Sequence, residues 1–186
     1  MSYINKTLIF EEDKIYYTDE DITLEVMMGW EDLIMKASAD YVCENGGDIL
    51  EFGFGMGISA GYIQANNINS HTIIENHPQI IEKLKLWAED KPNVIIIEGD
   101  WYNIKDSLST YDGIFYDTYG EQDWSRFATE LPLLTKLGTK VTWWNNNPEQ
   151  STIHNIHDVV YETISVNPPS NSYFNSSVYY LPKKEF

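Results

Sequence analysis

Cysteine is nearly absent from this sequence of 186 residues, because Cys43 is its single representative. One cysteine cannot form an intramolecular disulfide. The sequence therefore excludes a small secreted fold that depends on disulfides for its stability.

Long apolar runs are also missing. The longest aliphatic run, Val94 to Ile97, is far shorter than the roughly 20 residues that span a bilayer as a helix. The segment from Met1 to Lys6 lacks the hydrophobic core of a signal peptide. We therefore expect a cytoplasmic protein with no membrane partner.

Basic residues are scarce. The chain has 12 Lys and Arg against 29 Asp and Glu, so its formal net charge is −17. Such a surface repels phosphate backbones, which argues against a nucleic-acid partner. The acidic excess serves solubility and is compatible with a cationic ligand.

The four histidines do not form a metal-ligand cluster with the cysteine. We therefore predict no metal site. We also expect His154 and His157 to face solvent on a short helix.

Repeats, low-complexity tracts and Pro/Ser-rich linkers are lacking as well, and the composition is that of a globular protein. We expect one domain over residues 1–186. Its predicted parts are an N-terminal segment or lid (1–23), a cofactor and catalytic core (24–145) and a C-terminal edge hairpin (146–186). The tyrosine-rich stretch from Lys14 to Tyr17 fits either a short strand or part of the lid.

What the sequence does contain is a regular alternation of elements. Apolar residues at helical spacing predict a helix from Leu24 to Glu44, which Asn45-Gly46-Gly47 ends. Short apolar runs predict buried strands at 48–52, 71–75, 94–97, 112–116 and 140–144. Further helices are predicted at 58–64, from His77-Pro78 to residue 88, and at 123–137. Strands that alternate with helices indicate a parallel sheet.

The last two predicted strands, 159–166 and 177–181, have no helix between them, which indicates an antiparallel hairpin. The arrangement resembles that of class I methyltransferases. We predict an α/β, Rossmann-like fold with a mostly parallel seven-stranded sheet and a C-terminal antiparallel hairpin.

A glycine-rich loop follows the first predicted strand of the sheet. Gly53, Gly55 and Gly57 stand at every second position, which predicts close approach of the backbone to a ligand. Ile58 stands where a dinucleotide fingerprint requires glycine, so a pyrophosphate is disfavoured. S-adenosylmethionine suits the loop, and Glu51 is placed to reach its cationic side. The alternative is a simple tight connection.

Two later strand ends complete the predicted cofactor site. Glu75 ends the second strand, where an acidic residue binds the ribose hydroxyls of a nucleotide-type ligand. Asp100 and Trp101 follow the third strand and suit hydrogen bonding and stacking with adenine. Trp101 fits a place in the core equally well.

Several segments in this order resemble guanidinoacetate N-methyltransferase. They are Val26 to Glu31, Leu50 to Met56, Ile73 to Glu75 and Tyr111 to Tyr119. The resemblance is strongest from Val26 to Trp124, and its most specific parts are Trp30-Glu31 and Tyr116-Asp117-Thr118-Tyr119.

The resemblance implies that Glu31 and Asp117 grip the guanidinium of the methyl acceptor. Two carboxylates match the planar fork of N–H donors on that cation. A protonated guanidinium has no free lone pair, so we take Asp117 as the candidate base. Trp30 and Thr118 join the predicted substrate contacts, and Met28 joins the predicted cofactor contacts.

Other interpretations remain open. Glu31 on a helix is often a solvated acid, and an aspartate such as Asp117 often caps a turn. The stretch from Trp143 to Pro148 departs from the family where the resemblance implies contact with the acceptor's carboxylate. The acceptor is then guanidinoacetate or an analogue, a protein arginine, or an amine. An aminopropyl transferase and a non-catalytic cofactor-binding subunit are further alternatives.

Overall fold

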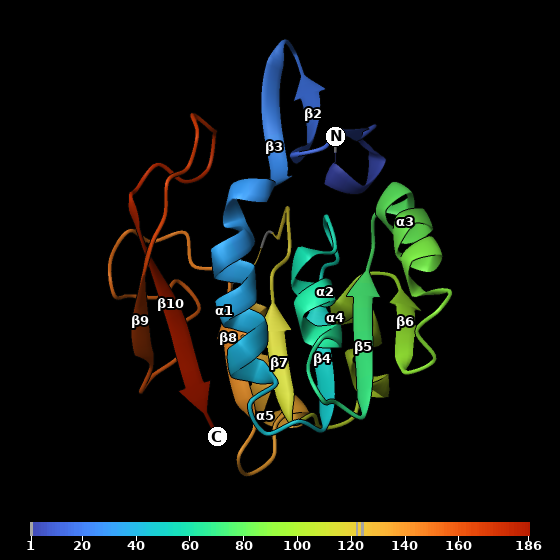
Figure 1. Cartoon of the computed structure of the whole chain (residues 1–186), viewed down its shortest axis with the longest axis vertical. Coiled ribbons are helices and arrows are strands. Elements are labelled where there is room, and N and C mark those ends of the chain that lie inside the picture. Colours follow the sequence, from blue (N-terminus) through green and yellow to red (C-terminus); the bar gives the residue numbers. More distant parts are fainter. Residues whose placement is uncertain (1, 122, 124) are drawn as a thin grey trace.

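A computed structural model of the chain describes residues 2–121, 123 and 125–186. Within this described part, strands form one large sheet and one small sheet (Figure 1). The large sheet contains β4 (Asp48–Phe52), β5 (Ser70–Glu75), β6 (Val94–Glu98), β7 (Gly113–Tyr116), β8 (Lys140–Trp143), β9 (Val160–Ser165) and β10 (Val178–Glu185).

The large sheet has the strand order β6-β5-β4-β7-β8-β10-β9. The strands from β6 to β8 run parallel, and β10 pairs antiparallel with both β8 and β9. The prediction of a mostly parallel seven-stranded sheet with a C-terminal antiparallel hairpin is therefore confirmed. Each central strand begins and ends within about two residues of its predicted bounds.

Helices cover both faces of the large sheet, which explains why its central strands are apolar on both sides. On one face lie α1 (Asp32–Val42), α2 (Ile58–Gln64) and α3 (Pro78–Ala88), and on the other lie α4 (Trp101–Ile104) and α5 (Ser125–Leu134) (Figure 1). Ile49 and Phe115 pack with the first group, whereas Leu50 and Ile114 pack with the second. The core is thus split into two layers by the sheet.

The small sheet contains β1 (Ile9–Phe10), β2 (Lys14–Asp19) and β3 (Ile22–Met28), in that order and antiparallel. It lies beyond the carboxyl ends of the parallel strands (Figure 1). The tyrosine-rich stretch is therefore a strand. Because β3 crosses residue 24, the small sheet extends past the expected end of the N-terminal segment.

The predicted helix from Leu24 to Glu44 is wrong in its first part. Residues 22–28 form β3, a short 3-10 turn covers Gly29–Glu31, and the helix begins only at Asp32. Met27, Trp30 and Ile34 do fall at helical spacing, but pairing with β2 and the break at Gly29 prevail over that pattern.

The short helix expected around His154 is also absent from this described segment, and His154 is buried against aromatic rings, including Trp143. His157 is exposed, as expected. No helix in the described residues is long and apolar enough to cross a membrane.

Candidate active site

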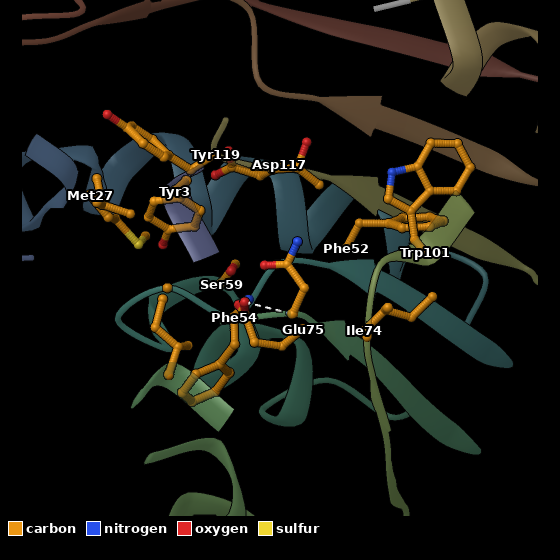
Figure 2. Close-up of a pocket in the computed structure, with 17 residues that line it drawn as sticks. Tyr3, Met27, Phe52, Phe54, Ser59, Ile74, Glu75, Trp101, Asp117 and Tyr119 are labelled. Atoms are coloured by element: carbon orange, nitrogen blue, oxygen red, sulfur yellow. Dashed lines mark hydrogen bonds between the residues drawn. The ribbon is translucent and has the colours of Figure 1, made fainter. Parts of the chain in front are cut away.

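A cavity with about 650 Å³ of empty space, part of it open to solvent, lies where β4, β5 and β7 end (Figure 2). Ligands of open parallel sheets bind at these carboxyl ends. The lining residues are Tyr3, Val26, Met27, Phe52, Gly53, Phe54, Gly55, Ser59, Ile74, Glu75, Asn76, Ile80, Gly99, Trp101, Asp117, Thr118 and Tyr119.

This cavity brings together only part of the predicted site. The predicted residues that line it are Gly53, Gly55, Glu75, Trp101, Asp117 and Thr118. The predicted residues outside its lining are Met28, Trp30, Glu31, Glu51, Gly57 and Asp100.

The glycine loop owes its glycines to contacts within the protein. Gly53, Gly55 and Gly57 all have positive φ, at 84°, 54° and 76°. A Cβ on Gly53 would overlap the carbonyl oxygen of Asp117, and a Cβ on Gly57 would overlap the ring of Phe54. Contacts within the protein therefore require glycine at these two positions, apart from any ligand in the cavity.

Met27, at the end of β3, lies against the same loop. Its sulfur accepts the backbone N–H of Met56 at 3.1 Å, and it faces the space that a Cβ on Gly55 would fill. Met27 lines the cavity, whereas its neighbour Met28 is buried outside the lining. The methionine that borders the cavity is thus Met27, whereas the sequence predicted Met28.

Glu75 is held by backbone amides at the end of β5. One carboxylate oxygen accepts the N–H of Phe54 at 3.0 Å (Figure 2), and the other accepts the N–H groups of Asn76 and His77, each at 2.8 Å. Three amide donors fix this carboxylate at the cavity wall and join the end of β5 to the glycine loop.

Glu51 lies beneath the loop. It is fully buried, and its carboxylate accepts hydrogen bonds from Ser59 Oγ and from His71 Nε2, the latter at 2.9 Å. Each carboxylate oxygen therefore has a partner within the protein. Glu51 thus lies outside the cavity lining and joins β4 to Ser59 of α2 and His71 of β5.

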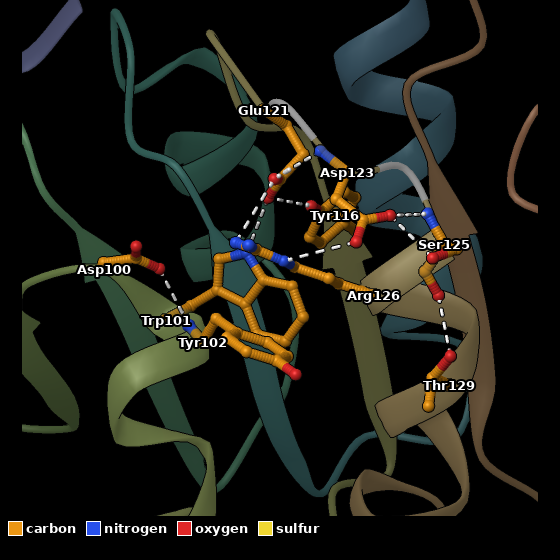
Figure 3. Close-up of polar contacts among 9 residues, drawn as sticks. All are labelled: Asp100, Trp101, Tyr102, Tyr116, Glu121, Asp123, Ser125, Arg126 and Thr129. Atoms are coloured by element: carbon orange, nitrogen blue, oxygen red, sulfur yellow. Dashed lines mark hydrogen bonds and ion pairs between the residues drawn. The ribbon is translucent and has the colours of Figure 1, made fainter. Parts of the chain in front are cut away.

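Asp100 and Trp101 also have partners within the protein (Figure 3). Asp100 is exposed and caps α4, because its side chain accepts the N–H of Tyr102 at 2.9 Å. Trp101 is buried and lines the cavity, and its Nε1 donates to Glu121 at 3.3 Å. Glu121 also accepts from Tyr116 Oη at 3.2 Å, so it joins the loops after β6 and β7.

Glu31 is buried at the start of α1, with 3% of its surface exposed. Its Oε1 accepts the N–H of Met28 at 2.7 Å and the hydroxyl of Tyr173 at 2.5 Å. Burial, followed by repulsion from the nearby Asp117 carboxylate, raises the pKa of Glu31 to about 8. The alternative of a solvated surface acid is excluded by this burial.

Asp117 follows β7, and its backbone N–H continues the sheet by donating to Phe52 at 3.0 Å. Burial, followed by repulsion from Glu51, raises the pKa of its carboxyl to about 7. Neither Asp117 nor Glu31 has an ion-pair partner among the described residues. The Asp117 carboxylate thus repels that of Glu31 without a protein cation to offset it.

Two predicted substrate residues present unpaired polar atoms. In the described part of the chain, Trp30 Nε1 and Thr118 Oγ1 are buried without a hydrogen-bond partner. Such groups are costly unless a ligand or water completes them. No group of three or more His, Cys, Asp or Glu in the described residues is arranged to hold a metal ion.

Sequence reasoning missed several aromatic residues around these acids. Tyr3 and Tyr119 line the cavity with their rings 4.7 Å apart between centroids. Tyr173 stacks on Trp30, with centroids 6.2 Å apart and planes inclined by 26°. Tyr119 belongs to the Tyr116-Asp117-Thr118-Tyr119 motif, whereas Tyr3 and Tyr173 lie in segments without a motif.

A second, shallower groove lies beside Tyr173. It is lined by Asn146, Pro148, Tyr173, Phe174, Asn175 and Ser176. These described lining residues carry amides, a hydroxyl and aromatic rings but no charge.

Known proteins resemble this chain in sequence and in fold. The sequence profile of a family described as guanidinoacetate N-methyltransferase matches residues 9–138. Protein arginine N-methyltransferase 2 of Emericella nidulans is 39% identical over 137 residues, which cover 69% of this chain and 31% of that protein. The protein of the same name from Kluyveromyces lactis is 31% identical over 208 residues, which cover 91% of this chain and 51% of that protein. The chain thus spans about a third to a half of the length of these curated relatives.

Among solved structures, N-methyltransferase NodS from Bradyrhizobium japonicum has a TM-score of 0.63 at 12% identity, over 83% of this chain and 94% of that chain. At this identity the likeness concerns the fold alone. The profile match covers most of the sequence, including Glu31, the glycine loop and Asp117. With the fold of a class I methyltransferase, this chain belongs to the guanidinoacetate N-methyltransferase family.

Proposed function

We propose that this chain is an S-adenosylmethionine-dependent N-methyltransferase that acts on a guanidino group. The observation that carries this proposal is the pair of acids formed by the buried Glu31 and the half-buried Asp117, which lack a cationic partner among the described residues. Placing two carboxylates together costs free energy unless a cation joins them. A guanidinium supplies that charge, and its planar N–H fork suits two carboxylates at once.

The residues of the cavity fit the proposed cofactor. Its charged lining residues, in the part of the chain described, are Glu75 and Asp117, and both are acids. Aromatic rings make up much of the rest, and an aromatic face attracts a cation such as a sulfonium. A pyrophosphate would meet acids and no basic residue here. The fit therefore favours S-adenosylmethionine over a dinucleotide.

In this arrangement, Glu75 would bind the ribose hydroxyls, because a carboxylate has about four acceptor positions and three amides use only part of them. Gly53 and Gly55 would let the backbone border the ligand, and Trp101 would lie beside its base. The cofactor supplies an electrophilic methyl group. The chain supplies binding, orientation and proton transfer.

Glu31 and Asp117 would orient the acceptor so that one nitrogen faces the cavity. Orientation of this kind contributes a large part of catalysis, with effective molarities that reach about 10⁵ M or more. Asp117 would also accept the proton that the attacking nitrogen loses. Its pKa of about 7 is near the operating pH, which is the optimum for a general base.

The acceptor can be a small guanidino acid or an arginine side chain in a polypeptide. Neither the cavity nor the second groove has a Lys or Arg among its described lining residues, so a free carboxylate on the acceptor would have no counter-charge. The curated relatives are named as protein arginine methyltransferases. Both observations favour an arginine side chain in a polypeptide over a small guanidino acid as the acceptor.

The test is a methyl-transfer assay with isotopically labelled S-adenosylmethionine and three acceptors: guanidinoacetate, free L-arginine and the blocked peptide acetyl-Gly-Arg-Gly-amide. Mass spectrometry identifies the methylated nitrogen, and spermidine precursors or simple amines serve as non-guanidine controls. We expect transfer to a guanidine, with the blocked peptide preferred. Cofactor binding without transfer to any guanidine would contradict the proposal and support a non-catalytic binding subunit.

A further inference from the structure

The acceptor side of the site is completed by a residue from the far end of the chain. Tyr173 lies in the connection between β9 and β10, outside the residues 9–138 that the family profile matches. Its hydroxyl donates to Glu31 Oε1 at 2.5 Å. We propose that Tyr173 is a positioning residue of the acceptor site, whose hydroxyl holds the Glu31 carboxylate in place and favours its charged form.

The fold places this hydroxyl independently of Glu31. Asn171 Oδ1 accepts the N–H groups of Tyr173 at 2.9 Å and of Phe174 at 2.7 Å, which forms a tight turn around the tyrosine. Ser172 ties the turn to the small sheet, because its N–H and its hydroxyl donate to Glu25 at 3.1 and 2.6 Å. These hydrogen bonds hold the turn that carries Tyr173 in place, and none of them involves Glu31.

The hydrogen bond from Tyr173 matters because it affects the charge state of Glu31. The titratable groups that face Glu31 are Asp117 from the end of β7, Tyr173 from the turn and Tyr179 from β10. Burial and Asp117 both raise the pKa of Glu31, whereas the hydrogen bonds from Tyr173 and from the Met28 N–H lower it. Loss of the Tyr173 hydroxyl would leave Glu31 protonated over more of the neutral pH range. A protonated Glu31 cannot balance a cation.

A direct test is a ¹³C NMR titration of the Glu31 carboxyl in protein labelled at glutamate, with Glu31→Gln used to assign the signal. We expect Tyr173→Phe, which keeps the ring, to raise the pKa of Glu31 by about one unit, the scale of a hydrogen bond to a charged group. An unchanged titration would overturn the proposal.

The matched control is Ser172→Ala, which removes the hydroxyl bond to Glu25 but keeps the backbone N–H bond to Glu25 and the tyrosine. We expect Glu31 to titrate in this variant as in the wild type. If Ser172→Ala shifted the titration as much as Tyr173→Phe, order of the turn would explain the effect and the proposed role of the hydroxyl would be wrong.

Site-specific incorporation of a ring-fluorinated tyrosine at position 173 provides a second test, which does not require the phenylalanine variant to fold. The fluorinated phenol keeps the shape of the ring and donates a stronger hydrogen bond. We therefore expect the pKa of Glu31 to fall, opposite to the effect of Tyr173→Phe. A rise or no change would contradict the proposal.

The consequence for catalysis rests on the proposed function. With the guanidine that the wild type methylates best among the three acceptors, Tyr173→Phe should raise the KM of the acceptor by about 10-fold or more. The acidic limb of kcat/KM should move to higher pH, and cofactor affinity should stay unchanged. In a Glu31→Gln background the same substitution should add little. Lack of transfer by the wild type would refute the proposed function, while the NMR titration would still decide the role of Tyr173.

Discussion

The backbone of Gly53 packs directly against the carbonyl oxygen of Asp117, so a Cβ at this position would overlap that oxygen. The contact joins the glycine loop after β4 to the acid after β7 across two neighbouring strand ends. Because Gly53 N–H also donates to Ile74 O at 2.8 Å, the loop has little room to move aside. One glycine thus sets the spacing between the cofactor side and the acceptor side.

Gly53→Ala should therefore destabilise the protein and disturb both sides of the site. The positive φ of 84° alone costs a non-glycine residue roughly 1–3 kcal/mol, and the overlap adds to this cost. Urea unfolding measures the effect. Gly61→Ala is the matched control, because Gly61 lies in α2 with nothing within 4 Å of its added Cβ. There we expect stabilisation of about 0.5–1 kcal/mol. Equal effects at the two positions would show that the Gly53 contact is unimportant.

Replacing Glu75 by Gln should weaken cofactor binding. The amide keeps one acceptor oxygen but turns N–H donors toward the backbone amides and the ribose, which costs about 1–3 kcal/mol, or about 10- to 100-fold in affinity. Calorimetry with S-adenosylhomocysteine measures the change. Glu98→Gln is the control, since Glu98 is the register partner of Glu75 on β6 but is exposed outside the cavity. If both variants bind like the wild type, Glu75 has no role in holding the ribose.

Asp117→Asn should lower kcat with little change in cofactor affinity, because the amide keeps the shape of the side chain but is not basic. Loss of a general base typically costs about 10² to 10⁴ in rate. Single-turnover kinetics, combined with cofactor titration, separates the two effects. Asp106→Asn is the control, because it removes one negative charge from an exposed side chain outside the cavity. A rate within about threefold of the wild type would leave Asp117 as a turn cap only.

The raised pKa of Glu31 also predicts how stability depends on pH. Its unfolded value is about 4.3, whereas its folded value is about 8, so folding favours the protonated form. The stability that this proton contributes is present at low pH and is lost as pH rises from about 4.3 through about 8. Glu31→Gln should avoid the loss while keeping an acceptor for Met28 N–H. We expect the variant to gain on the order of a few kcal/mol over the wild type at pH 8.5 and little at pH 5.

Urea unfolding of both proteins at several pH values tests this expectation, and the same samples should show that the more stable variant is the less active one. Such an exchange of stability for function is common where an active site holds like charges together. A stability difference that is constant with pH would mean that Glu31 is charged in the folded protein throughout this range.

Much of the fold could be predicted from the sequence because local patterns and burial agreed there. The helix α2 has its predicted bounds, Ile58–Gln64, and Pro78 marks the start of α3. The prediction failed at β3, where Met27 and Trp30 fit a helical period and the partner strand β2 decided the outcome. Pairing between strands is not visible in the spacing of one of them.

The candidate site was predicted less completely, and the reason lies in hydrogen bonding. Residue types and spacing marked Glu51 and Asp100 as ligand contacts, but both lie outside the cavity lining, where Glu51 binds Ser59 and His71 and Asp100 accepts the N–H of Tyr102. Conversely, Tyr173 carries no motif, and only the turn built by Asn171 brings it to Glu31. The hydrogen-bond partners of a side chain depend on the folded arrangement, which residue types and spacing do not show.

The hydrogen bond between Tyr173 and Glu31 joins residues 142 positions apart in the chain, whereas that between Phe54 and Glu75 spans 21. Contacts between distant residues close a long loop and form late when a chain folds. The cavity wall around Glu75 is therefore expected to assemble early, and the acceptor side only after β9 and β10 have docked. During refolding, affinity for the cofactor should return first and methyl transfer last, so activity reports that the final hairpin is in place.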